Sequence, residues 1–323
     1  MIKILANDGI DAAGKKIFEA AGFSVSTDKV AQENLGSALN NFDAVLVRSA
    51  TQVRKEHIDA APNLKLIGRA GVGMDNIDVK YARENGRVVV NTPAASSQSV
   101  AELVFAQLFA GVRFIHDSSK NLPASETKET FDALKKKYSS GIELRGKTIG
   151  IIGAGQIGKS VAAMAVGLGM NVLFHRLNNE DVVVDLDFHP ALHQRKVTIT
   201  FKCVTFTKLL IESDFITMHV PFPKGSEPVI GKKEFDLMKQ GAALVNTARG
   251  GVASETELLE ALNSGKLSFA GLDVFEGEPL IKKELREHPK LILTPHIGGS
   301  TKEAQERIGI ELAEKVVEYF TKK

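Results

Sequence analysis

The feature that most constrains the fold of this 323-residue chain is a glycine motif between an apolar run and a helical pattern. Residues 149–158 read Ile-Gly-Ile-Ile-Gly-Ala-Gly-Gln-Ile-Gly, a G-x-G-x-x-G motif at Gly153, Gly155 and Gly158. An apolar strand before the motif and a helix after it, from Ser160 to Val166, are the context in which it indicates a dinucleotide site. Gly153 permits the tight turn, Gly155 admits the pyrophosphate, and Gly158 lets helix and strand pack closely.

Short apolar runs alternate with helical patterns along the rest of the chain, which predicts an α/β protein with parallel sheets. A first series of expected strands comprises Ile2–Leu5, Phe23–Ser26, Ala44–Val47, Leu64–Ile67 and Arg87–Val90. A second series comprises Thr148–Ile152, Val172–Phe174, Phe215–His219, Ala243–Asn246, Ala270–Asp273 and Leu291–Leu293. The two series predict two domains, since the length also exceeds that of one ordinary domain.

Three further segments have distinct patterns. Residues 97–112 form an apolar helix with few charges, which indicates burial. The tail begins with a capping-box pattern at Ser300 and Glu303 and continues as an amphipathic helix, whose apolar side needs the first domain as a surface. Between 178 and 203, period-two alternation on two arms (one ending in Phe188, the other from Val197 to Cys203) predicts an inserted β-hairpin.

Charge and cysteine content exclude several classes of partner. The net charge is +2, so no global field attracts nucleic acid or an anionic membrane, and no apolar run has the roughly 20 residues of a membrane span. Cys203 is the single cysteine, so no intramolecular disulfide forms. No spaced cluster of cysteine and histidine indicates a metal. We expect a cytoplasmic protein that binds no nucleic acid, membrane or metal.

The sequence leaves open which residue recognises the ribose of the cofactor. A dinucleotide site normally places Asp or Glu about twenty residues after the motif, to hold the ribose hydroxyls. After Val172-Leu173-Phe174 this chain has His175 and Arg176 instead. Arginine suits a 2′-phosphate, which favours NADP. If Glu180 or Asp181 supplies the missing carboxylate, the cofactor is NAD.

Three late segments follow expected strands and carry the reactive groups. Arg249 lies in Asn-Thr-Ala-Arg-Gly-Gly, Glu278 in Asp-Val-Phe-Glu-Gly-Glu-Pro, and His296 in Thr-Pro-His-Ile-Gly-Gly. The carboxyl ends of parallel strands form the edge at which open α/β sheets bind ligands. A base, a carboxylate beside it and a cation are therefore expected at one edge.

With these residues in view, the chain resembles the D-2-hydroxyacid dehydrogenases over essentially its whole length, and their phosphoglycerate dehydrogenase branch in particular. The motifs that carry this resemblance are Arg48-Ser49-Ala50-Thr51, the run from Gly68 to Asp78, Asn91-Thr92-Pro93, His219-Val220-Pro221 and the run from His296 to Thr301.

The resemblance implies two domains with a cleft between them. Residues 1–96 and 297–323 would form a flavodoxin-like substrate domain, and residues 97–296 an inserted Rossmann domain that binds NAD(P) and carries the hairpin at 178–203. Arg249 would bind the substrate carboxylate, His296 would take the C2 hydroxyl proton, and Glu278 would hold His296 while hydride passes to nicotinamide. The implied substrate contacts are Arg48, Ser49, Val72 and Gly73. The implied cofactor contacts are Gly153, Gly155, Gln156, Ile157, Gly158, His175, Arg176, His219, Val220, Pro221, Thr247, Asp273 and Gly298.

The implied reaction is oxidation of 3-phosphoglycerate to 3-phosphohydroxypyruvate for serine biosynthesis, with NAD as cofactor and NADP in question because of Arg176. Two alternatives stay open at this point, an NADPH-dependent glyoxylate or hydroxypyruvate reductase and a dinucleotide-sensing, corepressor-like binding protein. A homodimer or higher homo-oligomer is the family pattern. The chain ends at Lys323, so the resemblance implies a short form without the serine-binding ACT domain.

Overall fold

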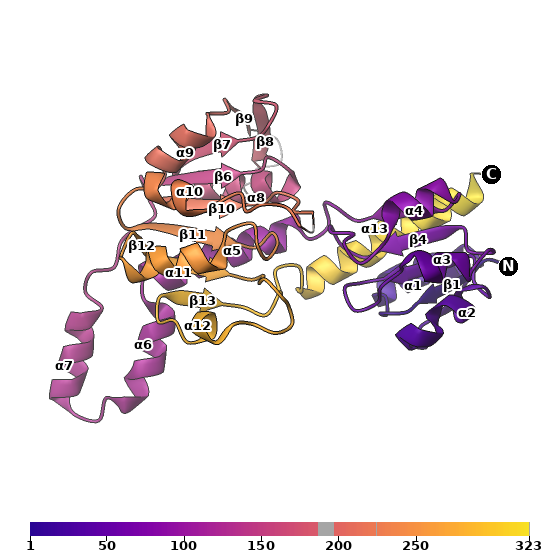
Figure 1. The fold of residues 1–323 in the computed structure, drawn as a ribbon, viewed down its shortest axis with the longest axis horizontal. Coiled ribbons are helices and arrows are strands. Elements are labelled where there is room, and N and C mark those ends of the chain that lie inside the picture. Colours follow the sequence, from indigo (N-terminus) through magenta and orange to yellow (C-terminus); the bar gives the residue numbers. More distant parts are fainter. Residues whose placement is uncertain (187–196, 224, 323) are drawn as a thin grey trace. The chain divides into compact units, whose positions relative to one another are not determined.

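The chain divides into two compact units in a computed structural model, which describes residues 1–186, 197–223 and 225–322 (Figure 1). Unit 1 comprises Met1–Ser99 and Gly299–Lys323, and unit 2 comprises Val100–Gly298. These boundaries lie close to those expected from the sequence, 96/97 and 296/297. Each unit contains its own parallel sheet.

Unit 1 has a five-stranded sheet in the order β2-β1-β3-β4-β5, in which every neighbouring pair is parallel. This order is the flavodoxin-like one. The strands are β1 (Lys3–Ala6), β2 (Ser24–Ser26), β3 (Ala44–Val47), β4 (Leu66–Arg69) and β5 (Val88–Asn91). The helices are α1 (Ala12–Ala20), η1 (Gln32–Asn34), α2 (Leu35–Leu39), α3 (Lys55–Asp59), α4 (Val79–Glu84) and α13 (Lys302–Thr321).

The strands β1, β3 and β4 in the middle of the unit 1 sheet are buried on both faces, which explains their short and nearly continuous apolar runs. Ile4 and Leu46 pack on the side of α1 and α13. Leu5 and Val45 point to the opposite side, where α2 and α3 lie.

Helix α13 returns the end of the chain to unit 1. It approaches α1 so closely that a Cβ on Gly14 would lie 2.4 Å from the carbonyl oxygen of Gly309. Its N-cap is Thr301, whose hydroxyl accepts from the amide of Ala304 at 3.2 Å. The capping box expected at Ser300 and Glu303 is therefore wrong by one residue, because Thr301 adopts the extended backbone of an N-cap.

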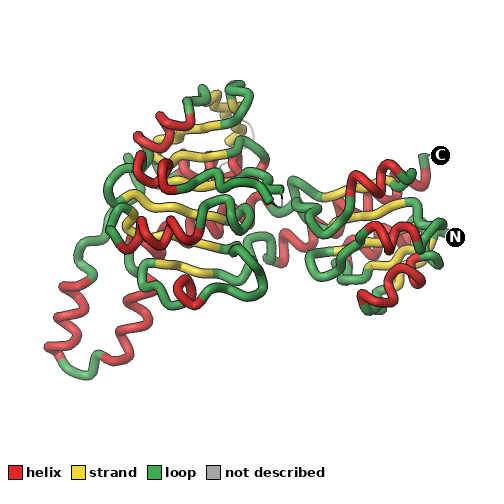
Figure 2. Tube along the Cα trace, viewed as in Figure 1, coloured by secondary structure: helices red, strands yellow, loops and turns green. Residues whose placement is uncertain are grey.

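Unit 2 has a six-stranded parallel sheet in the order β13-β12-β11-β10-β6-β7 (Figure 2). Its strands are β6 (Thr148–Ile152), β7 (Asn171–His175), β10 (Phe215–Met218), β11 (Ala242–Asn246), β12 (Leu267–Leu272) and β13 (Leu291–Leu293). Its helices are α5 (Ser97–Val112), α6 (Ile115–Asn121), η2 (Leu122–Ala124), α7 (Lys128–Lys137), α8 (Gln156–Gly167), α9 (Phe206–Glu212), α10 (Lys232–Leu237), α11 (Glu255–Asn263) and α12 (Lys283–Arg286).

A separate two-stranded sheet lies beside β7. Strands β8 (Val182–Leu186) and β9 (Val197–Phe201) pair antiparallel, and alternate residues of β8 are buried in the core that also includes α8. Cys203, just after β9, forms an isolated parallel bridge to Phe174 of β7. The segment expected to join the two arms, including Phe188, lies outside the described residues.

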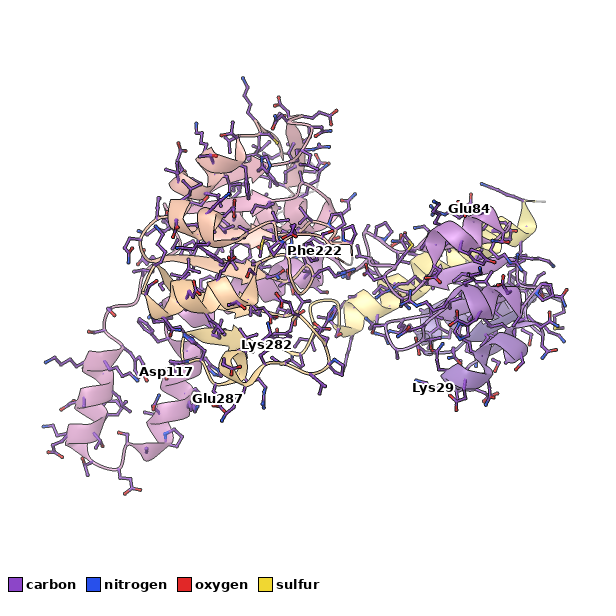
Figure 3. All side chains as sticks on the ribbon, in the orientation of Figure 1. Lys29, Glu84, Asp117, Phe222, Lys282 and Glu287 are labelled. Atoms are coloured by element: carbon purple, nitrogen blue, oxygen red, sulfur yellow. The ribbon has the colours of Figure 1, made fainter. Side chains whose placement is uncertain are left out.

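Helices α6 and α7 form an arm that projects from the sheet of unit 2 (Figure 1). Neither helix has a buried residue, and Asp117 of α6 accepts hydrogen bonds from Lys137 at 2.8 Å and Tyr138 at 2.7 Å (Figure 3). No helix was expected here, because the two are short and mainly polar. The signal was Thr127, which caps α7 by accepting from the amide of Thr130.

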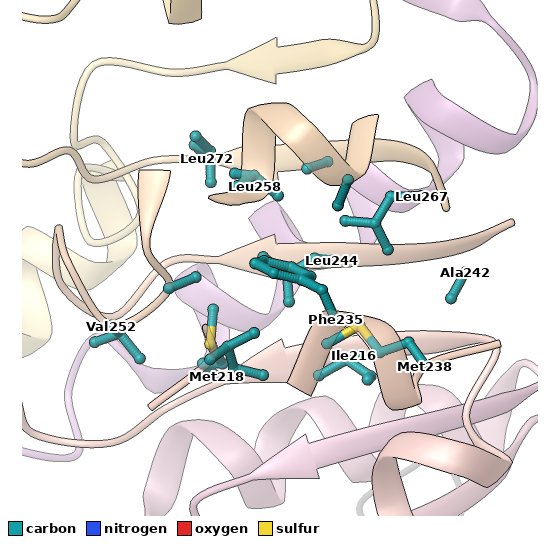
Figure 4. Packing of buried hydrophobic residues seen from close by; sticks show 14 of the residues in the cluster. Ile216, Met218, Phe235, Met238, Ala242, Leu244, Val252, Leu258, Leu267 and Leu272 are labelled. Atoms are coloured by element: carbon teal, nitrogen blue, oxygen red, sulfur yellow. The ribbon is translucent and has the colours of Figure 1, made fainter. Parts of the chain in front are cut away.

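In the core of unit 2, strands β10, β11 and β12 pack against α10 and α11. Ile216, Leu244 and Leu272 of three neighbouring strands pack with Phe235 and Leu258 of the helices (Figure 4). All five side chains are at most 2% exposed. The loops that leave these strands therefore start from fixed points.

Helix α5 is the most apolar of the long helices, and Val104, Phe105 and Leu108 are buried. Among the described residues, no single helix is long and apolar enough to cross a membrane. Together, α5 and residues 115–124 have the length and apolar composition of a membrane-spanning segment, but a bend of 58° separates them.

Candidate active site

Five of the loops at the carboxyl edge of the unit 2 sheet carry the glycine motif and the expected reactive groups. They follow β6, β10, β11, β12 and β13, which are parallel, so their carboxyl ends share one edge. This edge carries the glycine motif, His219, Arg249, Glu278 and His296.

His296 and Glu278 are in direct contact. His296 Nδ1 lies 2.9 Å from Glu278 Oε2, and the two side chains are 50% and 34% exposed. The other carboxylate oxygen, Oε1, accepts from the amide of Phe275 at 2.8 Å. Burial raises the pKa of Glu278, but the bonds from His296 and Phe275 and the charge of Arg249 outweigh it and hold the pKa below its usual value. Glu278 is therefore an anion facing the imidazole.

Asp273 holds the loop that presents His296. Its Oδ1 accepts from Thr294 Oγ1 at 2.6 Å and from the amide of Ile297 at 2.8 Å, and its Oδ2 accepts from the amide of Gly298 at 2.8 Å. The residue is 1% exposed. A buried carboxylate needs such donors, so Asp273 holds the loop on both sides of His296, by the Thr294 side chain before it and two backbone amides after it. Contacts of Asp273 and Gly298 with a cofactor stay predictions.

Arg249 lies in a turn that Asn246 closes. Asn246 Oδ1 accepts from the amide of Ala248 at 3.0 Å, and its Nδ2 donates to the carbonyl oxygen of Arg249 at 2.8 Å. The guanidinium donates to the carbonyl oxygen of Ala248 at 2.6 Å. A Cβ on Gly250 would lie 2.0 Å from the carbonyl oxygen of Phe275, so only glycine lets this turn touch the loop of Glu278.

The glycine motif forms a turn into α8. Gly153 has a φ of 101°, and a Cβ there would lie 2.4 Å from the carbonyl oxygen of His219. A Cβ on Gly158 would lie 2.2 Å from the carbonyl oxygen of Gly153. Gly155, the N-cap of α8, has open space where its Cβ would be, and Gln156 and Ile157 open the helix.

The motif also lies where the strand order reverses. β7 pairs on one side of β6 and β10 on the other, which makes this the switch point where doubly wound sheets bind their ligands. An anionic group here would meet the amides and positive end of a twelve-residue helix.

Two buried polar atoms at this edge fit a cofactor. His219 Nδ1 and Thr247 Oγ1 are buried without a hydrogen-bond partner among the described residues. Burial lowers the pKa of His219 to about 3, so its ring is neutral, and its Nε2 lies 3.0 Å from Thr217 Oγ1. Val220 and Pro221 continue the loop. These atoms and the open glycine suit a dinucleotide, whereas no group of three or more metal-binding side chains occurs among the described residues.

The last residue of β7, His175, and the next residue, Arg176, have different partners. His175 Nδ1 lies 3.1 Å from the carbonyl oxygen of Val204, and its ring packs on Phe206 at 5.1 Å between centroids. The bond turns His175 toward α9. Arg176 forms an ion pair with Glu180, with 3.2 Å between Nη2 and Oε2.

The turn that carries this pair is held by the cysteine. Cys203 Sγ donates to the carbonyl oxygen of Glu180 at 3.1 Å. Burial raises the pKa of the Cys203 thiol, so the side chain stays a protonated donor. A protonated thiol of this kind is a structural donor and not an activated thiolate.

In unit 1, two side chains fix the loop of Arg48 and Ser49. Asp8 Oδ2 accepts from the amides of Arg48 at 2.7 Å and Thr51 at 3.1 Å. Asn76 Nδ2 donates to the carbonyl oxygens of the same two residues, at 2.7 and 2.6 Å. Asp8 and Asn76 were missed in the sequence because their partners are distant along the chain.

The loop of Val72 and Gly73 lies at the same edge of the unit 1 sheet. The carbonyl oxygen of Val72 accepts from Asn91 Nδ2 at 2.7 Å, and Val72 is exposed. The register pairs Val47 with Arg69, so Arg48 and Arg69 leave neighbouring strands together. Two arginine residues are thus anchored at the same edge of the sheet.

Residues 105–298 match the family model described as the NAD-binding domain of D-isomer-specific 2-hydroxyacid dehydrogenases. A hydroxypyruvate reductase of Thermotoga maritima is 38% identical over 97% of both chains. A D-3-phosphoglycerate dehydrogenase of Methanocaldococcus jannaschii is 39% identical over 98% of this chain, which spans 57% of that protein.

Solved structures share the whole fold. An acyclic imino acid reductase in complex with NADPH and D-Arg superposes with a TM-score of 0.83 at 28% identity, covering 100% of this chain and 98% of that one. A 3-phosphoglycerate dehydrogenase of Entamoeba histolytica with bound NAD⁺ gives a TM-score of 0.77 at 26% identity, covering 99% and 95%.

Proposed function

The chain belongs to the family of D-isomer-specific 2-hydroxyacid dehydrogenases, and from this premise we propose that its substrate is 3-phosphoglycerate, which it oxidises to 3-phosphohydroxypyruvate for serine biosynthesis. Its relatives include NAD-dependent dehydrogenases, and residues 105–298 match the family's NAD-binding domain. The observation that carries the chemistry is the 2.9 Å contact between His296 and Glu278, next to the turn of Arg249.

The contact assigns a role to each ring nitrogen. Nδ1 faces the Glu278 carboxylate, so it carries the proton and Nε2 is left to accept the proton of the C2 hydroxyl. Arg249 holds the C1 carboxylate, because a guanidinium offers two parallel N–H bonds to a carboxylate. Bound NAD supplies the hydride acceptor for the C2–H bond.

The chain's own residues would hold NAD along the switch point. The amides at Gly155 and the start of α8 suit the pyrophosphate. Thr247 Oγ1 and His219 Nδ1 need hydrogen-bond partners, which a dinucleotide offers. Because the His219 ring is neutral, one of its nitrogens donates and the other accepts.

Two arginines support a phosphorylated substrate. Arg48 and Arg69 leave neighbouring strands at one sheet edge, and Asp8 and Asn76 fix the loop of Arg48. Guanidinium pairs suit a phosphate dianion. The alternative is reduction of glyoxylate or hydroxypyruvate, which the similarity to a hydroxypyruvate reductase favours.

Steady-state kinetics with 3-phosphoglycerate, D-glycerate and glycolate distinguish the two. We expect kcat/KM for 3-phosphoglycerate to exceed that for D-glycerate at least about tenfold, since each charge-assisted bond contributes about 1.5–3 kcal/mol. Arg48→Met should reduce this preference, and Lys80→Met, on a side chain that is 90% exposed, should not. A preference for D-glycerate would contradict the proposal and support the reductase.

The cofactor preference depends on Arg176 and Glu180. We expect NAD to be preferred, because Glu180 already pairs with Arg176 and would repel a 2′-phosphate. Glu180→Gln should then shift the ratio of NADP to NAD binding toward NADP by several-fold, up to about tenfold. Isothermal titration calorimetry measures both affinities, and Glu212→Gln, which also removes the carboxylate of an i,i+4 ion pair, is the matched control. A strong wild-type preference for NADP that Arg176→Ala erases would overturn this expectation.

We propose that the protein also forms a homodimer, with the α6–α7 arm as the interface. Ile115, Leu122 and Phe131 are 52–53% exposed around a hollow of about 460 Å³ on the arm. These exposed apolar side chains are best covered by an equally apolar surface, and the same arm of a second copy supplies one across a two-fold axis. Sedimentation should give the mass of two chains, and Phe131→Glu should halve it, whereas Lys136→Glu on the same helix should not. A monomeric wild type would refute the proposal.

A further inference from the structure

Glu255 is a buried carboxylate with no part in the proposed proton or hydride transfer. It is the first residue of α11 and is 4% exposed. A carboxylate this deeply buried needs compensating charge and donors. Its partners show what it holds.

The partners of Glu255 come from the loop after β12. Glu255 Oε1 accepts from the amide of Glu276 at 2.5 Å, and Glu276 Oε1 accepts from the amide of Glu255 at 3.4 Å. Lys282, which Figure 3 labels, donates to Glu276 Oε2 at 3.0 Å, and its ammonium lies 3.0 Å from Glu255 Oε2 as an ion pair. Two carboxylates thus share one ammonium.

This cluster lies between two parts of the proposed site. On one side, the turn of Arg249 touches the backbone of Phe275 and Glu276 through Gly250. On the other, the amide of Phe275 binds Glu278, which holds His296. A shift of Glu276 therefore moves Glu278 relative to Arg249.

We propose that Glu255 and Lys282 are positioning residues, which set the distance between Arg249 and the Glu278–His296 pair by clamping Glu276. This inference rests on the proposed function, since it assigns the clamp a role in that reaction. The clamp works by charge: with Lys282 present, the two carboxylates are drawn together, and without it they repel each other.

The charges that act on Glu255 make the clamp sensitive to pH once Lys282 is removed. Burial raises the pKa of Glu255 and the nearby Glu276 raises it further, whereas Lys282 and the Glu276 amide lower it. Loss of Lys282 removes a lowering influence, so Glu255 takes up a proton at higher pH. Protonation relieves the repulsion, and the loop then returns toward its wild-type position.

Three variants test the clamp: Lys282→Met, Lys282→Met with Glu255→Gln, and Lys283→Met as control. We expect Lys282→Met to lower kcat on the order of tenfold at pH 8, since a 1 Å misplacement in a site can cost about 10²-fold. Its kcat relative to wild type should rise as the pH falls. The double variant should recover to within a few-fold of wild type at every pH, because the amide removes one charge. Lys283 pairs with Glu287 on the surface, so its loss should change nothing.

A readout independent of turnover separates this inference from the proposed function. The ring resonances of His296, assigned by comparison with a His296→Ala spectrum, should shift in Lys282→Met and return in the double variant, even if the substrate is another acid. Melting temperatures identify a purely structural role, in which stability changes but the kcat ratio stays flat across pH. A flat ratio, or a double variant as slow as Lys282→Met, would overturn the proposal. If repulsion between Glu255 and Glu276 prevents Lys282→Met from folding, the double variant, which removes one of the two charges, must fold. A double variant that does not fold would also contradict the proposal.

Discussion

Replacing His296 with alanine is expected to lower kcat by about 10²–10⁴-fold, the range that a general acid–base group contributes. Nδ1 of the ring is committed to Glu278 at 2.9 Å, so Nε2 is the nitrogen placed to accept the substrate proton. Alanine leaves no acceptor at that position. Affinity for NADH should change little, because the substitution removes only the ring, and Asp273 still holds the amides of Ile297 and Gly298 in the same loop.

Glu278→Gln tests the same histidine–carboxylate pair by changing the carboxylate. The amide keeps the shape of the carboxylate but loses its charge, so it no longer stabilises the protonated ring that forms during the reaction. We expect a smaller loss of kcat than in His296→Ala, and little further loss when the two changes are combined, since the residues act as a unit.

Rapid-reaction kinetics and NADH fluorescence titration measure chemistry and cofactor affinity separately. His116→Ala, an exposed histidine on α6, is the matched control. Near-wild-type turnover of His296→Ala at neutral pH would remove His296 from the proposed role. Equal losses of turnover and NADH affinity would instead indicate a collapsed cofactor site.

The sequence predicts the strands well where both faces are covered. All four residues of Ala44–Val47 and of Phe215–Met218 are buried, and such runs are typical of parallel sheets. The placement of Arg249, Glu278 and His296 near one another follows from the same logic, because each comes after a strand of one sheet. The 2.9 Å contact between His296 and Glu278 fits that reading.

Other features depend on partners that a local pattern does not contain. Asp8 binds Thr51, which is 43 residues away, and Asp273 binds Thr294, 21 residues away. The α6–α7 arm lacks buried residues, and the helically spaced Phe131, Leu134 and Tyr138 stand among so many charged residues that the pattern is masked. At the start of α13, Ser300 and Thr301 both suit an N-cap, and the backbone decides between them.

Arg249→Lys is expected to reduce kcat/KM by about 10²-fold or more, even though the charge is retained. The guanidinium is oriented by its bond to the carbonyl oxygen of Ala248 at 2.6 Å, inside a turn that Asn246 closes. Lysine keeps a positive charge near Glu278 but has no planar fork, so a change in rate reports the loss of carboxylate orientation. The affinity for NADH should stay within a few-fold of wild type.

The acid and amide forms of one substrate make this test specific. If Arg249 grips the C1 carboxylate, the wild type should strongly prefer the acid over its amide, and Arg249→Lys should lose most of that preference along with its rate. Arg286→Lys, on α12 at the surface, controls for a general effect of the substitution. A variant that is slower but discriminates acid from amide as well as the wild type would place the carboxylate on another cation, and Arg48 and Arg69 of unit 1 would be the next to replace.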